Sequence, residues 1–207
     1  MESNYQNLII GLGTGRCGTT SLCRLLDLQN HSNFTHEFGA SPLVNWQTNK
    51  IDFDKIYRRL RIRKEKFIGD VGFYNLSYWK HILDLKEYDT KFIILKRNKQ
   101  DVIKSYVRTT IKWNPFLAHD GTNWKFYDWD KCYPKMNTPD KEEAISMYYD
   151  YYYDLCREIP SDKCYWLNTD MLNNQEKCVK LLKWCGFKEP KFNVFHANKK
   201  LHIKQDN

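Results

Sequence analysis

The chain has 207 residues, of which 42% are hydrophobic and 15% aromatic, and its formal net charge at pH 7 is +8. These values exclude a disordered chain and favour one domain over two, and no apolar run is long enough to span a membrane. The positive charge indicates an anionic ligand. The amino-terminal stretch MESNYQNLII is not typical of a secretory signal, so we expect a cytoplasmic protein.

Apolar, β-prone runs alternate with helical patterns, which predicts a single-domain α/β fold over residues 1–207. We expect a mostly parallel central sheet flanked by helices, as in P-loop NTPases. The expected strands are 7–12, 66–71, 91–97 and 163–169, and the expected helices are 19–28, 76–88, 99–113, 138–159 and 174–187. Segment 29–37 is too polar for a buried strand, and 113–137 is expected to be irregular. Thr138 is the expected cap of its helix, and Gly186 the expected end of the last one.

The sequence does not have the spacing of a metal site. None of the seven cysteines belongs to a C-x-x-C pair, and the six histidines include no H-x-x-x-H. We therefore expect reduced cysteines in the core and no bound metal. The basic stretch 57–66 is interpreted as the solvated face of a helix, since Phe53, Ile56 and Leu60 have helical spacing, and this does not favour a nucleic-acid partner.

The stretch GTGRCGTTS (13–21) joins the first strand to the first helix. Such a turn binds phosphate because backbone N–H groups at the helix start converge on one point. The glycines fit the G-x-G-x-x-G of a dinucleotide site, with Glu37 at the right distance but without a strand before it. A P-loop would need lysine where Thr19 stands, and Asp70 is the nearest substitute for its magnesium-binding aspartate. In a third interpretation, Arg16 supplies the positive charge.

A second anion site is predicted on a neighbouring strand–helix turn. Arg97 closes the strand 91–97, and Ser105 lies eight residues later in the next helix. A guanidinium can bind a phosphate through two hydrogen bonds while the serine hydroxyl reaches the same group. The two turns together imply a ligand with two separated phosphate-like groups.

Together these motifs resemble the sulfotransferases that use 3′-phosphoadenosine 5′-phosphosulfate (PAPS). The R-x-G-T-T motif of that family is similar to residues 16–20, and its strand-closing arginine with a serine eight residues on is similar to Arg97 and Ser105. The stretches LNTDML and LLKWCGF are a looser match to a late strand of that family and the helix that follows it. The resemblance covers residues 8–187 and implies transfer of a sulfuryl group from PAPS to a hydroxyl or amine acceptor without a metal.

The same resemblance implies that the turn binds the 5′-phosphosulfate, and that Arg97 and Ser105 bind the 3′-phosphate. The implied turn residues are Gly13, Thr14, Gly15, Arg16, Cys17, Gly18, Thr19, Thr20 and Ser21. Lys199 and Lys200 are candidates for a late basic loop over the nucleotide. Many members of the family carry a lysine in or near the position where Val71 stands. Either another cation replaces it here, with Lys96, Lys199 and Lys200 as the candidates, or the geometry of the bound donor differs.

Transfer also needs a base for the acceptor proton and positive charge at the leaving phosphate. Arg16 is the candidate for the charge. His36 and Glu37 coincide with a Glu-Glu pair of the tyrosylprotein branch, whose second glutamate is catalytic. Glu37 is therefore the first candidate for the base, and His36, the residue type of cytosolic members, is the second. Adjacent side chains usually point differently, so we expect only one of them to face the site.

The acceptor stays open among small-molecule, glycan and peptide hydroxyls. Aromatic residues of a predicted loop can stack on an acceptor, although packing is favoured for them: Trp124, Phe126, Tyr127 and Trp129. Tyr148, Tyr151 and Tyr152 share a helix face with Leu155, which predicts core packing. Two other functions also stay open: a kinase or NTPase on the same fold, and a catalytically weakened binding protein for a nucleotide or sulfated glycan.

Overall fold

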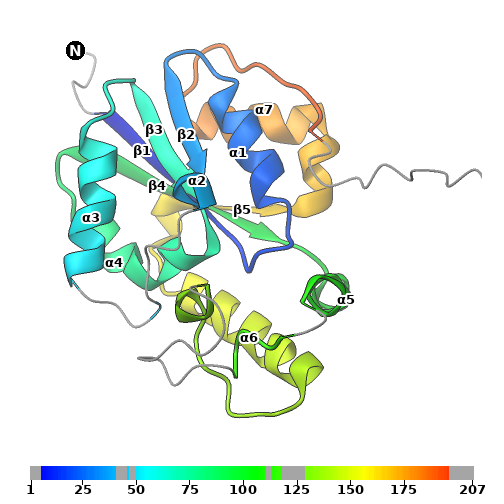
Figure 1. Ribbon diagram of the computed structural model, residues 1–207. Coiled ribbons are helices and arrows are strands. Elements are labelled where there is room, and N and C mark those ends of the chain that lie inside the picture. The colour runs from blue at the N-terminus through cyan, green and yellow to red at the C-terminus, as the bar shows by residue number, and fades with distance from the viewer. Residues whose placement is uncertain (1–5, 41–45, 47–49, 111–112, 118–128, 196–207) are drawn as a thin grey trace, which may run out of the picture.

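The computed structural model describes residues 6–40, 46, 50–110, 113–117 and 129–195. Its centre is a five-stranded sheet in the order β2-β3-β1-β4-β5, in which every neighbouring pair is parallel (Figure 1). The strands are β1 (Gln6–Leu12), β2 (Ser32–His36), β3 (Phe67–Val71), β4 (Tyr88–Lys96) and β5 (Cys164–Asn168). The predicted α/β fold with a parallel central sheet is confirmed.

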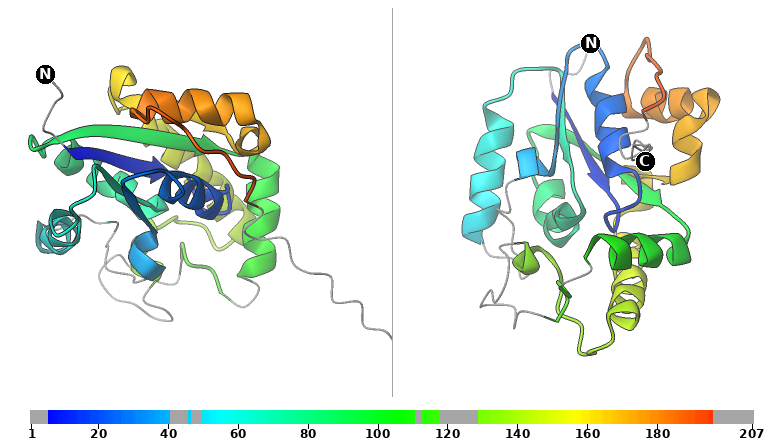
Figure 2. Two further views of the ribbon diagram at one scale, coloured as in Figure 1. Left: turned by 90° about the horizontal axis from the view of Figure 1, so that it is seen from above. Right: turned by 45° about the vertical axis from the view of Figure 1, so that its right-hand side comes forward.

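Helices cover both faces of the sheet. The α-helices are α1 (Thr19–Asp27), α2 (Glu37–Ala40), α3 (Lys50–Arg61), α4 (Trp79–Leu83), α5 (Lys99–Thr109), α6 (Lys141–Cys156) and α7 (Gln175–Cys185). Short 3-10 helices are η1 (Phe73–Tyr78), η2 (Asp130–Cys132), η3 (Ser161–Lys163) and η4 (Thr169–Asn173). The right-hand view of Figure 2 shows α3 on one side of the sheet and α1 and α7 on the other.

Two apolar layers hold this arrangement together, one on each face. Leu22 of α1 and Leu181 of α7 pack with Ile9 and Ile93 of the sheet. On the other face, the buried tyrosines of α6 join the layer formed by η1, α4 and α5. Because all strands are parallel, their carboxyl ends meet at one edge of the sheet, and the loops that follow them are brought together there.

The expectation that 29–37 contains no strand is wrong for β2, which spans residues 32–36 at the edge of the sheet. Phe34 is its only buried side chain, so the strand tolerates the polar residues around it. An edge strand also exposes backbone groups on one side. Here the Phe34 backbone N–H donates to Asp27 Oδ1 at 2.9 Å and so has a partner outside the sheet.

Several helix boundaries differ from those predicted. Segment 76–88 contains the end of η1 and the short α4 rather than one long helix. Helix α6 begins at Lys141 because the Asp140 side chain, not that of Thr138, accepts a hydrogen bond from the Glu143 N–H. Gly186 does end α7, with a φ of 103° that favours glycine.

The cysteines lie mostly in the core, as predicted, but the predicted core packing is wrong for one tyrosine. None of the seven cysteines, all of which lie among the described residues, forms a disulfide bond, and six of them are buried. Tyr148 and Tyr152 are fully buried as predicted, but Tyr151 is 43% exposed and lies outside the core. No helix among the described residues is both long enough and apolar enough to cross a membrane.

Candidate active site

The glycine turn follows β1 at the middle of the sheet and leads directly into α1. Gly15 and Gly18 have φ angles of 82° and 88°, and Arg16 between them has 57°, so the turn enters the left-handed region three times. A Cβ on Gly15 would collide with the Tyr106 hydroxyl. Gly18 is the N-cap of α1, and no described side chain caps this helix. The first N–H groups of α1 are therefore suited to bind an anion.

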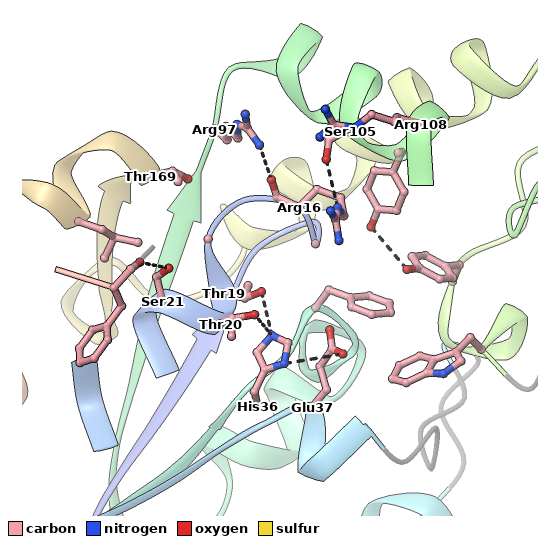
Figure 3. A pocket seen from close by; sticks show the side chains of 18 of the residues that line it. Arg16, Thr19, Thr20, Ser21, His36, Glu37, Arg97, Ser105, Arg108 and Thr169 are labelled. Carbon is pink, nitrogen blue, oxygen red and sulfur yellow. Dashed lines mark hydrogen bonds and ion pairs between the residues drawn. The ribbon is translucent and has the colours of Figure 1, made fainter. Parts of the chain in front are cut away.

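Arg16 connects this turn with the second predicted motif (Figure 3). The Arg97 guanidinium donates to the Arg16 carbonyl oxygen at 2.9 Å, and Arg16 Nε donates to Ser105 Oγ at 3.1 Å. Arg97 directly follows β4, and Ser105 lies on α5. Arg16, Arg97 and a third cation, Arg108 of α5, all line one pocket. Guanidinium groups gathered in this way repel one another, so the arrangement favours an anionic ligand.

His36 and Glu37 lie on the wall of the same pocket (Figure 3). β2 ends at His36, and the next two residues, Glu37 and Phe38, have left-handed φ angles of 51° and 45°. This sharp change of direction lets both side chains line the pocket, which differs from the alternation expected of an extended chain. His36 Nε2 lies 3.0 Å from Thr19 Oγ1, and His36 Nδ1 lies 3.9 Å from Glu37 Oε2.

The surroundings change the proton affinity of both groups. Burial raises the pKa of Glu37 to about 7; the charge of Asp70 adds to this increase, and the charge of Arg16 opposes it. Burial lowers the pKa of His36 below its ordinary 6.5, so the imidazole is neutral at pH 7. A carboxyl group whose pKa lies near the working pH can take up and release a proton. Of the two groups, Glu37 has the pKa nearer to neutral pH.

The pocket that joins these groups has a volume of about 590 Å³, within the range of small-molecule sites. Its polar lining comes from the two motifs and from η4, which follows β5: Arg16, Thr19, Thr20, Ser21, Arg97, Ser105, Arg108, Thr169 and Asn173. Its aromatic lining is Phe73, Tyr106, Trp113, Trp129, Tyr133 and Phe195. A single ligand in this space can contact cationic, hydroxyl and aromatic groups together.

Tyrosines beneath the turn hold its shape. The Tyr152 hydroxyl accepts from the Gly13 N–H at 2.9 Å and donates to the Phe73 carbonyl at 2.9 Å. The hydroxyls of Tyr148 and Tyr106 both donate to the Thr14 carbonyl. All three tyrosines are buried, and a buried hydroxyl network whose members are satisfied is rigid. The turn is therefore shaped before any ligand binds.

The geometry disfavours the two other interpretations of the turn. In a dinucleotide fold the acidic residue follows the strand next to the first one, but here β3 lies between β1 and the strand that ends beside Glu37. Asp70, the substitute for a magnesium ligand, is fully buried, and its oxygens accept from Thr35, Phe38 and Asn75. Among the described residues, no group of three or more His, Cys, Asp or Glu side chains could hold a metal ion.

Known proteins resemble this chain in structure rather than in sequence. No protein-family model and no curated protein sequence matches it. A sulfotransferase from Alicyclobacillus acidocaldarius superposes with a TM-score of 0.57 at 12% identity, over 95% of this chain and 87% of that one. The chain has a sulfotransferase-type fold.

Two further solved structures have TM-scores just below 0.5. Mouse sulfotransferase SULT7A1 complexed with PAP has a TM-score of 0.49 at 11% identity, over 94% of this chain and 61% of that one. The YorR protein of Bacillus subtilis, solved in complex with phosphorylated GDP, has a TM-score of 0.48 at 13% identity, over 86% of this chain and 94% of that one. The conclusion about the sulfotransferase-type fold therefore depends on the Alicyclobacillus structure.

Within this sulfotransferase-type fold, most of the residues predicted for the site share the pocket: Gly15, Arg16, Gly18, Thr19, Thr20, Ser21, His36, Glu37, Arg97 and Ser105. Gly13, Thr14 and Cys17 are buried and are not part of the lining. Lys199 and Lys200 lie outside the described residues, as do Trp124, Phe126 and Tyr127.

Val71 stands where the resemblance described above would place a lysine. Val71 is fully buried. Lys96, one of the suggested replacements, lies over the Tyr153 ring at 5.6 Å from its centroid and is not among the pocket residues. Arg108 does line the pocket, and the sequence prediction missed it. It could have been found from its position three residues after Ser105, which places both on one face of α5.

The prediction also missed the wall built by the last third of the chain. Thr169, at the carboxyl end of β5, could have been found from the rule that ligands bind at this edge of a parallel sheet. The place of Phe195 in the pocket could not have been found from the sequence, because it depends on contacts with residues far away in the chain. Ser21 Oγ donates to the Phe195 carbonyl at 2.7 Å, and the Gln29 side-chain amide exchanges two hydrogen bonds of 2.8 Å with the backbone of Lys191.

Proposed function

We propose that this protein is a sulfotransferase that moves a sulfuryl group from PAPS to a hydroxyl or amine of an acceptor. The observation that carries the proposal is the meeting of the two anion-binding motifs at Arg16, whose carbonyl contacts Arg97 and whose side chain contacts Ser105. A ligand with one phosphate-like group would need only one of these motifs. PAPS has two such groups, one at each end of its ribose.

In this proposal the donor lies along the pocket with its 5′-phosphosulfate at the glycine turn. The N–H groups at the start of α1 and the hydroxyls of Thr19 and Thr20 bind that end. The 3′-phosphate is bound by Arg97 and Ser105, and Arg108 supplies a further positive charge from the same helix. Leu172 and Phe195 offer apolar surface for the adenine ring. No metal is needed because guanidinium and N–H groups balance the negative charge.

Glu37 removes the acceptor proton. The bond between the sulfur and the 5′-phosphate oxygen breaks as the acceptor oxygen or nitrogen bonds to the sulfur, which leaves adenosine 3′,5′-bisphosphate. Arg16 stabilises the phosphate oxygens that become more negative. His36, neutral and in contact with Thr19, orients that hydroxyl and is the second candidate for the base. The acceptor is a small-molecule, glycan or peptide hydroxyl, and Trp129 and Tyr133 offer it stacking surfaces.

The test compares two nucleotides by thermal shift. A ligand that binds only the folded protein stabilises it by about 2.7 kcal/mol at a concentration 100 times its Kd. Adenosine 3′,5′-bisphosphate should raise the Tm far more than adenosine 5′-phosphate at equal concentration. Equal shifts would contradict the proposal, and a shift that appears only with ATP and magnesium would support a kinase or NTPase.

A further inference from the structure

A buried carboxyl group lies behind the pocket wall at the end of β3. Asp70 is fully buried, and both of its oxygens are used. Oδ1 accepts from the Thr35 hydroxyl at 2.7 Å and from the Phe38 backbone N–H at 2.8 Å, and Oδ2 accepts from the Asn75 side-chain amide at 2.8 Å. A buried carboxylate is costly unless it is hydrogen-bonded in this way. The three donors come from β2, from the start of α2 and from η1.

One of these contacts acts directly on the turn that carries Glu37. Glu37 and Phe38 both have left-handed backbones, which cost roughly 1–2 kcal/mol per non-glycine residue. Such a turn persists only where its surroundings hold it. Both backbone groups of Phe38 are held: its N–H by Asp70, and its carbonyl oxygen by the Arg59 guanidinium at 3.3 Å.

We propose that Asp70 is the positioning residue for Glu37, which it places on the pocket wall by holding the left-handed turn through the Phe38 N–H. The inference rests on the proposed function only for the role of Glu37 as the base. Asp70 is not among the residues that line the pocket. Its effect on the reaction passes entirely through the position and charge state of Glu37.

The charges around Glu37 give this role a measurable consequence. The titratable groups that face it are Asp70 on β3, Arg16 in the glycine turn, His36 on β2, Tyr74 on η1 and Tyr133 after η2. The two tyrosines are neutral because burial raises their pKa values well above 10, and the imidazole is neutral because burial lowers its pKa. Above pH 7, Asp70 and Arg16 are the charged groups of this set.

Asp70 is ionised above pH 7 although its pKa is raised. Burial brings that pKa to about 6, and it would be higher without the hydrogen bonds from Phe38, Thr35 and Asn75 and the nearby Arg63 charge. The negative charge of Asp70 raises the pKa of Glu37. Loss of the charge, with the hydrogen bonds kept, should therefore lower the pKa of Glu37.

Asp70→Asn is suited to separate charge from position. The amide oxygen of the new side chain can accept from Thr35 and Phe38 as Oδ1 does now. Its NH₂ group can donate to the Asn75 amide oxygen once the Asn75 amide turns over. The pKa of Glu37 is read from the carboxyl ¹³C NMR shift across a pH titration, with the signal assigned by its absence in Glu37→Gln.

The expected result is a Glu37 midpoint at about pH 7 in the unchanged protein and a clearly lower midpoint in Asp70→Asn. Asp27→Asn is the matched control, because Asp27 also accepts from a β2 backbone N–H, that of Phe34 at 2.9 Å, but is exposed and is not among the charges that shift the pKa of Glu37. The Glu37 midpoint in Asp27→Asn should equal that of the unchanged protein. An unshifted midpoint in folded Asp70→Asn would overturn the inference.

Position is tested by hydrogen exchange at the Phe38 amide. The amide should be protected in the unchanged protein and in Asp70→Asn, and should lose protection in Asp70→Ala, which offers no acceptor. Equal protection in folded Asp70→Ala would also overturn the inference; if that variant does not fold, Asp70→Leu, which fills the space of the carboxyl group without offering an acceptor, takes its place in the exchange measurement. Neither measurement needs turnover. Failure of the proposed function would be seen instead as equal binding of adenosine 3′,5′-bisphosphate and adenosine 5′-phosphate, so it can be distinguished from failure of this inference.

Discussion

Replacing Arg97 with alanine tests whether the two motifs bind one ligand. If Arg97 binds the 3′-phosphate, its loss removes a charge-assisted hydrogen bond worth about 1.5–3 kcal/mol, or about 10- to 150-fold in Kd. The side chain is 38% exposed and lies 3.9 Å from Asp101, so solvent and a competing carboxylate weaken the contact. We therefore expect a loss near the lower end, about 10-fold.

The informative quantity is a ratio of two affinities. Arg97 also donates to the Arg16 carbonyl, so its loss can loosen the glycine turn and weaken every nucleotide. Dividing the Kd of adenosine 5′-phosphate by that of adenosine 3′,5′-bisphosphate cancels this shared effect and leaves the contribution of the 3′-phosphate. Isothermal titration calorimetry at one fixed ionic strength gives both constants, since salt screens such contacts.

Lys99→Ala is the control for a simple loss of charge. Lys99 begins α5 close to Arg97 in the sequence, but its ammonium group is bound to Asp150 at 2.6 Å and it is not among the pocket residues. The affinity ratio should be unchanged in Lys99→Ala and should fall about 10-fold in Arg97→Ala. If Arg97→Ala weakens both nucleotides equally, Arg97 only supports the turn, and the argument for a ligand with two phosphate-like groups fails.

Three more predictions test the base and the support of the turn. Glu37→Gln should bind adenosine 3′,5′-bisphosphate unchanged and lose about 10²- to 10⁴-fold in turnover, and unchanged turnover would assign proton transfer to His36. Because burial raises the pKa of Glu37 to about 7, turnover should fall as the pH is lowered through about 7, where the carboxyl becomes protonated and can no longer accept a proton; a constant rate down to pH 5 would argue against Glu37. Tyr152→Phe should lower the free energy of unfolding in urea by about 1–3 kcal/mol, because the Gly13 N–H loses its acceptor. The control Tyr151→Phe, on the exposed face of α6, should change it by less than about 0.5 kcal/mol. Equal losses in the two variants would contradict the support of the turn by α6.

The parts of the fold that local sequence determines were predicted well. β1, the glycine turn and α1 are consecutive, and the apolar run, the glycines and the helical stripe each indicate their own element. β2 was missed because an edge strand with one buried side chain, Phe34, lacks the apolar pattern of a central strand. The start of α6 was misplaced because Thr138 and Asp140 are both suitable caps, and only the hydrogen bond to the Glu143 N–H distinguishes them.

The candidate site was predictable where one short segment carries the signal. Arg97 and Ser105 belong to a single strand–helix turn, and the structure puts them in the pocket of the glycine turn. The shared wall of His36 and Glu37 was not predictable, because it depends on a left-handed turn held by Asp70, which lies 33 positions further along the chain than Glu37. Contacts of that range follow from the order of the strands, which the sequence pattern does not specify.

The charges of the pocket suggest how a sulfuryl group can be held without a lysine at the place of Val71. Arg16, Arg97 and Arg108 line the pocket and attract a ligand with several negative charges. A glutamate of ordinary pKa would be fully ionised at pH 7 and would repel the sulfuryl group at the moment of binding. Glu37, with a pKa of about 7, is only partly ionised there, so its repulsion is smaller while its capacity to accept a proton is retained. Under the proposed function, the three arginines together with a weakly acidic Glu37 can therefore meet the electrostatic need that a lysine at the place of Val71 would otherwise meet.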